Sequence, residues 1–120
     1  MKLCQQKNTV EHQNSDHCVV SEYPLDASSI NMATAKITGR YPKIGYATNH
    51  KVHEMAYIQA GQGSLTVNNQ TTLLEKGDVI LVEPGDQFYW DGNLTLIIAC
   101  TPAFTPEQHE VVQDKMSTAL

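Results

Sequence analysis

Two histidines and a glutamate stand close together near the middle of the chain, at His50, His53 and Glu54. An imidazole and a carboxylate at this spacing can share a proton, contact a polar ligand or coordinate a metal ion. An apolar run over residues 55–60 follows at once and stops at Gly61, which is typical of a strand that leads into a turn. The pattern therefore predicts chemically active side chains at the start of a strand.

A second segment with the same organisation lies further along the chain. The run Val79–Val82 is apolar at every position, as expected of a strand covered on both faces, and Pro84 and Gly85 then turn the chain. Beyond this turn, Phe88 and Trp90 share one face of the next strand because alternate strand residues point to the same side. Two such rings can form a wall for a flat or sugar-like ligand, or can be ordinary core residues.

Short strands separated by turn residues account for most of the chain. Alternating apolar and polar residues over 30–37 and 64–67 predict strands, and a longer apolar run over 94–100 predicts the last one. Glycine and asparagine predict turns at 61–63 and 91–93. About eight such strands predict an all-β barrel or double-sheet jelly roll.

The two ends of the chain differ from this central part. Residues 1–17 are mostly polar and predict a mobile segment, so the barrel is expected to occupy residues 18–104. Residues 105–120 are expected to hold a short helix and a tail. A capping pattern predicts that the helix runs from Pro106 to about Lys115.

Composition limits the classes of partner. A length of 120 residues predicts one domain, and a net charge of −5 with eight scattered Lys and Arg residues argues against nucleic acid. Neither a membrane-spanning run nor a secretory signal is evident, so a cytoplasmic location is the expectation. Cys4, Cys18 and Cys100 are odd in number and lack close spacing, which predicts reduced thiols.

The first segment resembles one of the paired motifs of the cupin superfamily. That motif has two histidines separated by one residue, then a glutamate, and then a glycine seven positions after the glutamate. Glu54 and Gly61 match its second half, and His50 stands where the second histidine is expected. The first histidine of the pair falls on Thr48.

The later segment resembles the second cupin motif, with Gly77 and Gly85 at the expected separation. The histidine of that motif falls on Phe88. The resemblance covers roughly residues 30–103 and implies the cupin jelly roll. Cupins commonly hold a metal with three histidines and one glutamate, of which only His50 and Glu54 carry over, so the metal-binding motifs are degenerate.

These observations favour a module that binds a small polar metabolite, sugar-like or acidic, inside the barrel and without a cofactor. The side chains expected at the ligand are Thr48, His50, Glu54, Phe88 and Trp90. Burial of ionisable groups opposite aromatic rings is a common property of ligand pockets. His50 and Glu54 could equally be a polar pair that anchors the core.

Two enzymatic alternatives remain open. In the first, His50 and Glu54 bind a divalent transition metal with His53 as the candidate third ligand, although alternation predicts that His53 points outward. In the second, Glu54 acts as base and His50 as acid in a metal-free isomerase or lyase.

The remaining candidates concern the surface. Tyr57 is expected to point outward, toward a dimer interface or a second sheet layer, and small cupins resembling this chain generally form homodimers. His12, His17 and His109 fall in polar segments and are expected to have no specific role.

Overall fold

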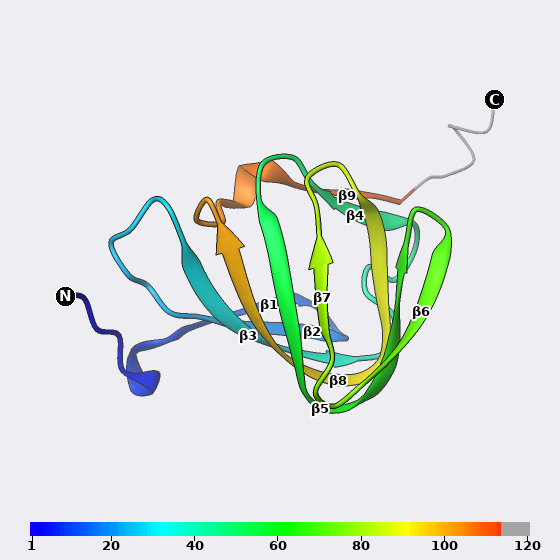
Figure 1. Ribbon diagram of the computed structural model, residues 1–120, viewed down its shortest axis with the longest axis horizontal. Helices are drawn as coiled ribbons and strands as arrows, with labels where there is room; N and C mark the ends of the chain where they lie inside the picture. The colour runs from blue at the N-terminus through cyan, green and yellow to red at the C-terminus, as the bar shows by residue number, and fades with distance from the viewer. Residues whose placement is uncertain (114–120) are drawn as a thin grey trace.

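The computed structural model describes residues 1–113, which form one curled sheet of nine strands (Figure 1). The sheet order is β1-β2-β3-β8-β4-β9, and β5 pairs with β6, β7 and β8. Two short 3₁₀ turns, η1 (Gln6–Asn8) and η2 (Pro106–Gln108), complete the architecture. The strands are β1 (Val10–Ser15), β2 (Cys18–Glu22), β3 (Asn31–Thr38), β4 (Tyr46–Asn49), β5 (His53–Val67), β6 (Gln70–Glu75), β7 (Val79–Val82), β8 (Gln87–Thr101) and β9 (His109–Val112).

Strand alternation decides which side chains face the interior. Along the first half of β5, Glu54, Ala56 and Ile58 are buried, whereas the residues between them are exposed. The buried side of the sheet forms one continuous apolar core, with fully buried side chains that include Ile37 and Leu96. Because successive strand residues point to opposite faces, the position of Glu54 in this series directs its carboxyl inward.

The two long strands, β5 and β8, pair along almost their whole length and bend together. The turns expected at residues 61–63 and 91–93 are absent, because both segments continue as strand. Gly63 pairs with Gly92 in this ladder, and Gly61 pairs with Leu94. A Cβ on Gly61 would lie 2.0 Å from the Asn93 carbonyl oxygen. The glycines therefore permit a close approach of two bent backbones rather than a reversal of the chain.

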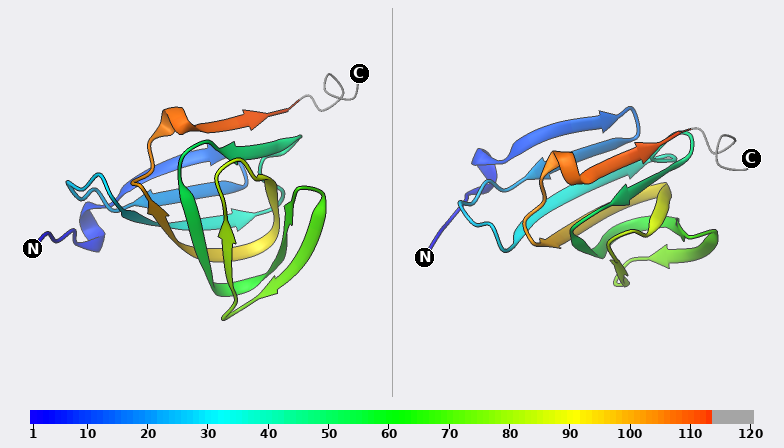
Figure 2. Two further views of the ribbon diagram at one scale, coloured as in Figure 1. Left: turned by 45° about the horizontal axis from the view of Figure 1, so that its top comes forward. Right: turned by 90° about the horizontal axis from the view of Figure 1, so that it is seen from above.

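The prediction of a helix from Pro106 onward is wrong, since the described part of the chain ends in a strand. Pro106–Gln108 forms one 3₁₀ turn, and His109–Val112 then pairs antiparallel with β4 (Figure 2). Valines at positions 111 and 112 favour a strand, and pairing satisfies backbone groups of β4 that the barrel alone leaves open. Lys115, the expected helix end, lies outside the described residues.

The N-terminal segment contributes a strand to the sheet. Residues 1–17 were expected to be mobile, with the barrel beginning at residue 18. In the structure, Val10–Ser15 forms β1 and pairs antiparallel with β2, with His12 opposite Val20. This pairing extends the sheet and brings side chains of β1 beside those of β2 and β3. Neither helical turn in residues 1–113 has the length and apolar character needed to span a membrane.

Candidate functional site

A cavity of about 350 Å³ lies within the curled sheet. This volume falls inside the range that small-molecule sites usually occupy. Side chains of β1, β2, β3, β5 and β8 line it, and most of its wall is apolar. Polar groups enter the wall at a few points only, among them Tyr41, Glu54 and His109. The cavity thus combines a large apolar surface with a few directional polar contacts.

Glu54 is the most deeply buried acid of the described residues. Its side chain faces the cavity, and its Oε1 accepts a hydrogen bond of 3.1 Å from the Nδ2 of Asn49. Burial raises the pKa of this carboxyl, and the bond from Asn49 opposes the rise only in part. Glu54 is therefore poised to hold a proton at a higher pH than an ordinary glutamate.

Asn49 connects Glu54 to His109, which lies 60 residues after Asn49 in the sequence. Its side-chain oxygen, which can only accept, lies 3.1 Å from the Nε2 of Gln108 and 2.8 Å from the Nδ1 of His109. The proton of the His109 ring consequently sits on Nδ1. Pairing of Asn49 with His109 between β4 and β9 sets this geometry.

The other nitrogen of His109 faces Tyr41. Its Nε2 lies 3.3 Å from the Tyr41 hydroxyl oxygen. Burial lowers the pKa of His109, and the nearby His50 lowers it further. The ring is therefore neutral, and its Nε2 accepts a hydrogen bond from the Tyr41 hydroxyl. Burial also raises the pKa of Tyr41 to about 12. Glu54, Asn49, His109 and Tyr41 thus form a continuous chain of hydrogen bonds, here called the polar relay.

Backbone contacts hold Tyr41 in place. Its amide donates to the carbonyl of Trp90 at 2.9 Å, and the amide of Trp90 donates to the Tyr41 carbonyl at 2.8 Å. The two buried rings therefore enter the cavity wall as neighbours. Phe88, two residues before Trp90 on the same face of β8, lies in the same wall.

Comparison with known proteins agrees with this architecture. The family model described as Cupin domain matches residues 40–98. An RmlC-like cupin from Shewanella frigidimarina superposes with a TM-score of 0.66 at 17% identity, covering 81% of this chain and 86% of that one. The chain belongs to the cupin superfamily. No curated protein sequence matches it significantly.

Two further solved structures are similar to this cupin. Streptomyces Pac13, described as a nucleoside dehydratase, superposes with a TM-score of 0.83 at 16% identity, covering 92% of this chain and 90% of Pac13. Variants of Pac13 have been solved with uridine. KdgF from a Halomonas species superposes with a TM-score of 0.67 at 10% identity, covering 83% of this chain and 94% of KdgF. At these identities the likeness concerns the fold.

The structure brings together three of the five side chains expected at the ligand. Glu54, Phe88 and Trp90 line the cavity of this cupin. Thr48 is buried but does not line the cavity, and its neighbour on β4, Asn49, is the residue that belongs to the polar relay. Tyr57 points outward on β5, as alternation predicts.

The inward orientation expected of His50 is wrong. Its side chain is 54% exposed, and its Nε2 lies 2.9 Å from Oε1 of Glu110. The His50 amide donates to the carbonyl of Gln108, so the turn after β4 is tied to the segment that leads into β9. Both partners come from the segment that was expected to be helical, and the contact with Glu110 on β9 keeps the His50 side chain at the surface, away from the cavity.

The residues present do not fit the metal centre that cupins commonly contain. His50 and His53 are both exposed, whereas Glu54 is buried in the interior, so the three ligands of the metal alternative point in different directions. Phe88, at the position of the third motif histidine, offers no coordinating atom. Within residues 1–113, no three His, Cys, Asp or Glu side chains lie close enough to hold a metal ion.

Sequence reasoning missed four side chains of the site. His109 and His12 were expected to have no specific role, yet both line the cavity, and the Nε2 of His12 lies 3.4 Å from Oε1 of Glu22. Tyr41 and Asn49 were not singled out. The alternation of β4 carries a signal for Asn49, because a polar residue there falls on the same face as Ala47, which is fully buried.

Proposed function

We propose that this cupin binds a small polar metabolite with a ring in its cavity. The observation that supports this most directly is the cavity itself, in which an apolar and aromatic wall faces the polar relay. Such a surface suits a sugar-like compound or a nucleoside, since one face of the ligand would pack on rings while its hydroxyls meet polar atoms. Pac13, similar in fold, has been solved with uridine, which makes a nucleoside a sensible first probe.

A binding screen with a cavity-filling variant tests the proposal. Thermal-shift measurements with uridine, other nucleosides, neutral sugars and sugar acids are expected to identify a ligand that raises the melting temperature of the wild type. Ala33 lines the cavity and is only partly buried, so Ala33→Phe should fill the space without disturbing the core. This variant is expected to fold and to lose the ligand-induced shift. A ligand that binds both proteins equally would contradict the cavity as the site.

A second candidate is metal-free acid/base catalysis, for which the polar relay provides the support. Burial raises the pKa of Glu54 and lowers the pKa of His109, so the carboxyl keeps its proton to a higher pH, and the imidazole loses its proton at a lower pH, than these groups do in water. Groups shifted in this way suit proton transfer in an isomerase or lyase. In this proposal Glu54 acts as the acid and His109 as the base, whereas the sequence had assigned the base to Glu54 and the acid to His50.

The protonation of Glu54 has a measurable effect on stability. Below pH 4.5 the carboxyl is protonated in both folded and unfolded chains, and above that pH the unfolded chain ionises first. The folded wild type then binds more protons, so its free energy of unfolding should fall as the pH rises from 4.5 through the raised pKa. Glu54→Gln, which keeps an oxygen to accept from Asn49, should remove this decline.

Urea unfolding of both proteins between pH 4.5 and 9 measures the difference. Each unit by which the pKa is raised corresponds to about 1.4 kcal/mol. His109, with its lowered pKa, contributes the opposite slope below pH 6.5 in both proteins and therefore cancels in the comparison. Parallel profiles for wild type and Glu54→Gln would show that Glu54 ionises normally and would remove it as the proton-holding group.

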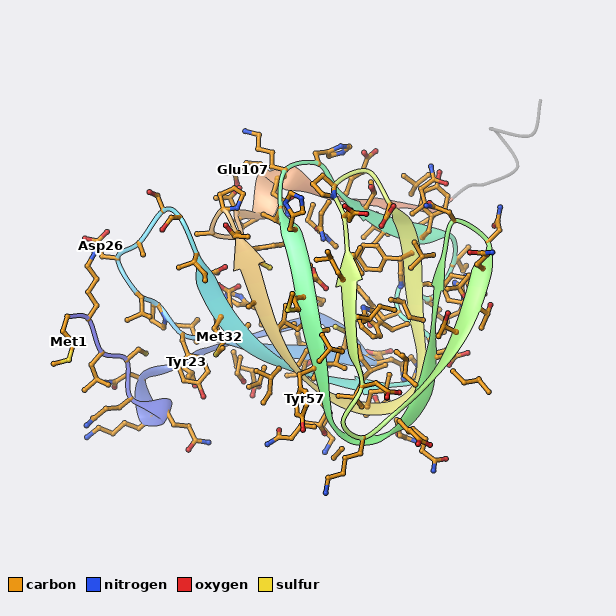
Figure 3. The ribbon with its side chains drawn as sticks, viewed as in Figure 1. Met1, Tyr23, Asp26, Met32, Tyr57 and Glu107 are labelled. Carbon is orange, nitrogen blue, oxygen red and sulfur yellow. The ribbon has the colours of Figure 1, made fainter. Side chains whose placement is uncertain are left out.

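We also propose that this cupin is a cytoplasmic homodimer. Five exposed apolar side chains, Met32, Met55, Tyr57, Val79 and Leu81, form an outer apolar face across β3, β5 and β7. Met32 and Tyr57 are labelled in Figure 3. Strand register places Met32, Ala99, Met55 and Leu81 in one row, and Tyr57 beside Val79 in the next. A second copy would cover this uncharged face with an identical one.

Light scattering at micromolar concentration tests the homodimer. The wild type is expected at twice the chain mass of 13.3 kDa, and Met55→Glu is expected at the mass of one chain because it places a charge in the centre of the outer apolar face. Leu73→Glu provides the matched control, since Leu73 is an exposed apolar residue on β6, outside that face. A monomeric wild type would contradict the proposal.

A further inference from the structure

The cavity wall contains no permanent cation. Within residues 1–113, no lysine or arginine lines the cavity. Lys36, although on β3, points away from the interior between the buried Ala35 and Ile37. Arg40 has partners outside the cavity. Its guanidinium donates to the carbonyls of Pro42 and Gly45 and stacks on the ring of Tyr89. An anionic group inside the cavity would find no lysine or arginine to pair with.

The histidines of the wall do not replace these cations. His109 donates its Nδ1 proton to Asn49, and its Nε2 faces the Tyr41 hydroxyl, so both ring nitrogens already have partners. His12 lies at the wall beside the carboxylate of Glu22. Any positive charge on His12 is therefore opposed by an acid 3.4 Å away, which weakens its attraction for an anion.

The remaining titratable groups of the wall are uncharged or negative. Cys18, Tyr41 and Cys100 keep their protons at neutral pH, since burial raises the pKa of Cys18 to about 11 and the pKa values of Tyr41 and Cys100 to about 12. Glu54 and Glu22 are the acids that face the cavity. The cavity consequently offers hydroxyl, carboxyl and amide groups to a ligand but no favourable field for negative charge.

We propose that the cavity takes uncharged, hydroxyl-bearing ring compounds and excludes their phosphorylated and carboxylated forms. This inference rests on the proposed binding function and narrows it, because the sequence left acidic metabolites open. A phosphate or carboxylate loses its hydration on entering an apolar cavity, and that cost is recovered only when a cation or several donors replace the water. Neutral hydroxyls carry a much smaller desolvation cost and can both donate and accept.

Isothermal titration with matched pairs of probes tests the inference on the wild type. Uridine is paired with uridine 5′-monophosphate, and methyl glucoside is paired with glucuronate. The neutral member of at least one pair is expected to bind, and its charged partner is expected to bind about 100-fold more weakly or not at all. Binding of a charged member as tight as that of its neutral partner would overturn the inference while leaving the binding function intact. Absence of binding by all four probes and by the wider screen would overturn both.

A variant that supplies the missing cation gives a second measurement. Asn14 lines the cavity on β1 and is exposed, so Asn14→Lys would place a mobile positive charge beside the ligand without burying it. The preference for uridine over its monophosphate is expected to shrink at least about tenfold in Asn14→Lys. Asn14→Met, similar in length and uncharged, is expected to keep the wild-type preference. An unchanged preference in Asn14→Lys would contradict the role assigned to cavity charge.

Discussion

Replacement of Asn49 by alanine is expected to lower the free energy of unfolding by about 3 kcal/mol. The fully buried side chain of Asn49 donates to Glu54 and accepts from Gln108 and His109. Alanine would leave the buried Glu54 and Gln108 and the half-buried His109 without their partner, and an unsatisfied buried polar group costs roughly 1–3 kcal/mol. Urea unfolding at pH 7 measures the loss.

His50→Ala is the matched control for this prediction. It also removes a hydrogen bond, to Glu110, but His50 lies at the surface. Water can replace that partner, and the expected change is within about 0.5 kcal/mol. Equal losses for Asn49→Ala and His50→Ala would show that the polar relay does not contribute to stability in the way its burial implies.

Replacement of Gly61 by alanine is expected to cost about 4 kcal/mol or to prevent folding. The new methyl group would lie 2.0 Å from the carbonyl oxygen of Asn93, where β5 and β8 bend together. Neither strand can withdraw without breaking the ladder that joins β5 to β8. Thermal and urea unfolding of the purified variant measure the effect.

Gly85→Ala separates this steric effect from backbone strain. Gly85 has a φ of +88°, almost equal to the +90° of Gly61, but a methyl group there would meet nothing within 4 Å. Only the cost of a positive φ, roughly 1–2 kcal/mol, should remain. Similar destabilisation of both variants would contradict the close approach of the two strands at Gly61.

Local patterns were sufficient for several features of the fold. Alternation over the start of β5 predicted that Glu54 points inward and Tyr57 outward, and the spacing of Phe88 and Trp90 predicted that both rings share a face. The glycines of the two cupin motifs predicted the family. Each of these inferences depends on residues a few positions apart, and strand geometry at that range is set by the local chain.

The glycine-rich segments at 61–63 and 91–93 show where local patterns fail. Glycine, asparagine and aspartate predicted turns at both places, but each segment continues as strand because it faces the other. A glycine permits a turn and equally permits the close passage of a second backbone. The identity of the partner strand decides between the two, and that identity is a tertiary property.

By itself, the sequence determined an all-β cupin with an inward carboxyl at Glu54 and an aromatic wall on β8, because these follow from alternation along single strands. Only the tertiary structure decided the companions of Glu54. Pairing of β9 with β4 places His109 in the polar relay, where His50 had been expected. Tyr41, which lies 68 residues before His109, completes the relay. No local spacing relates such distant residues, since the hydrogen bonds that join them form only when the sheet curls.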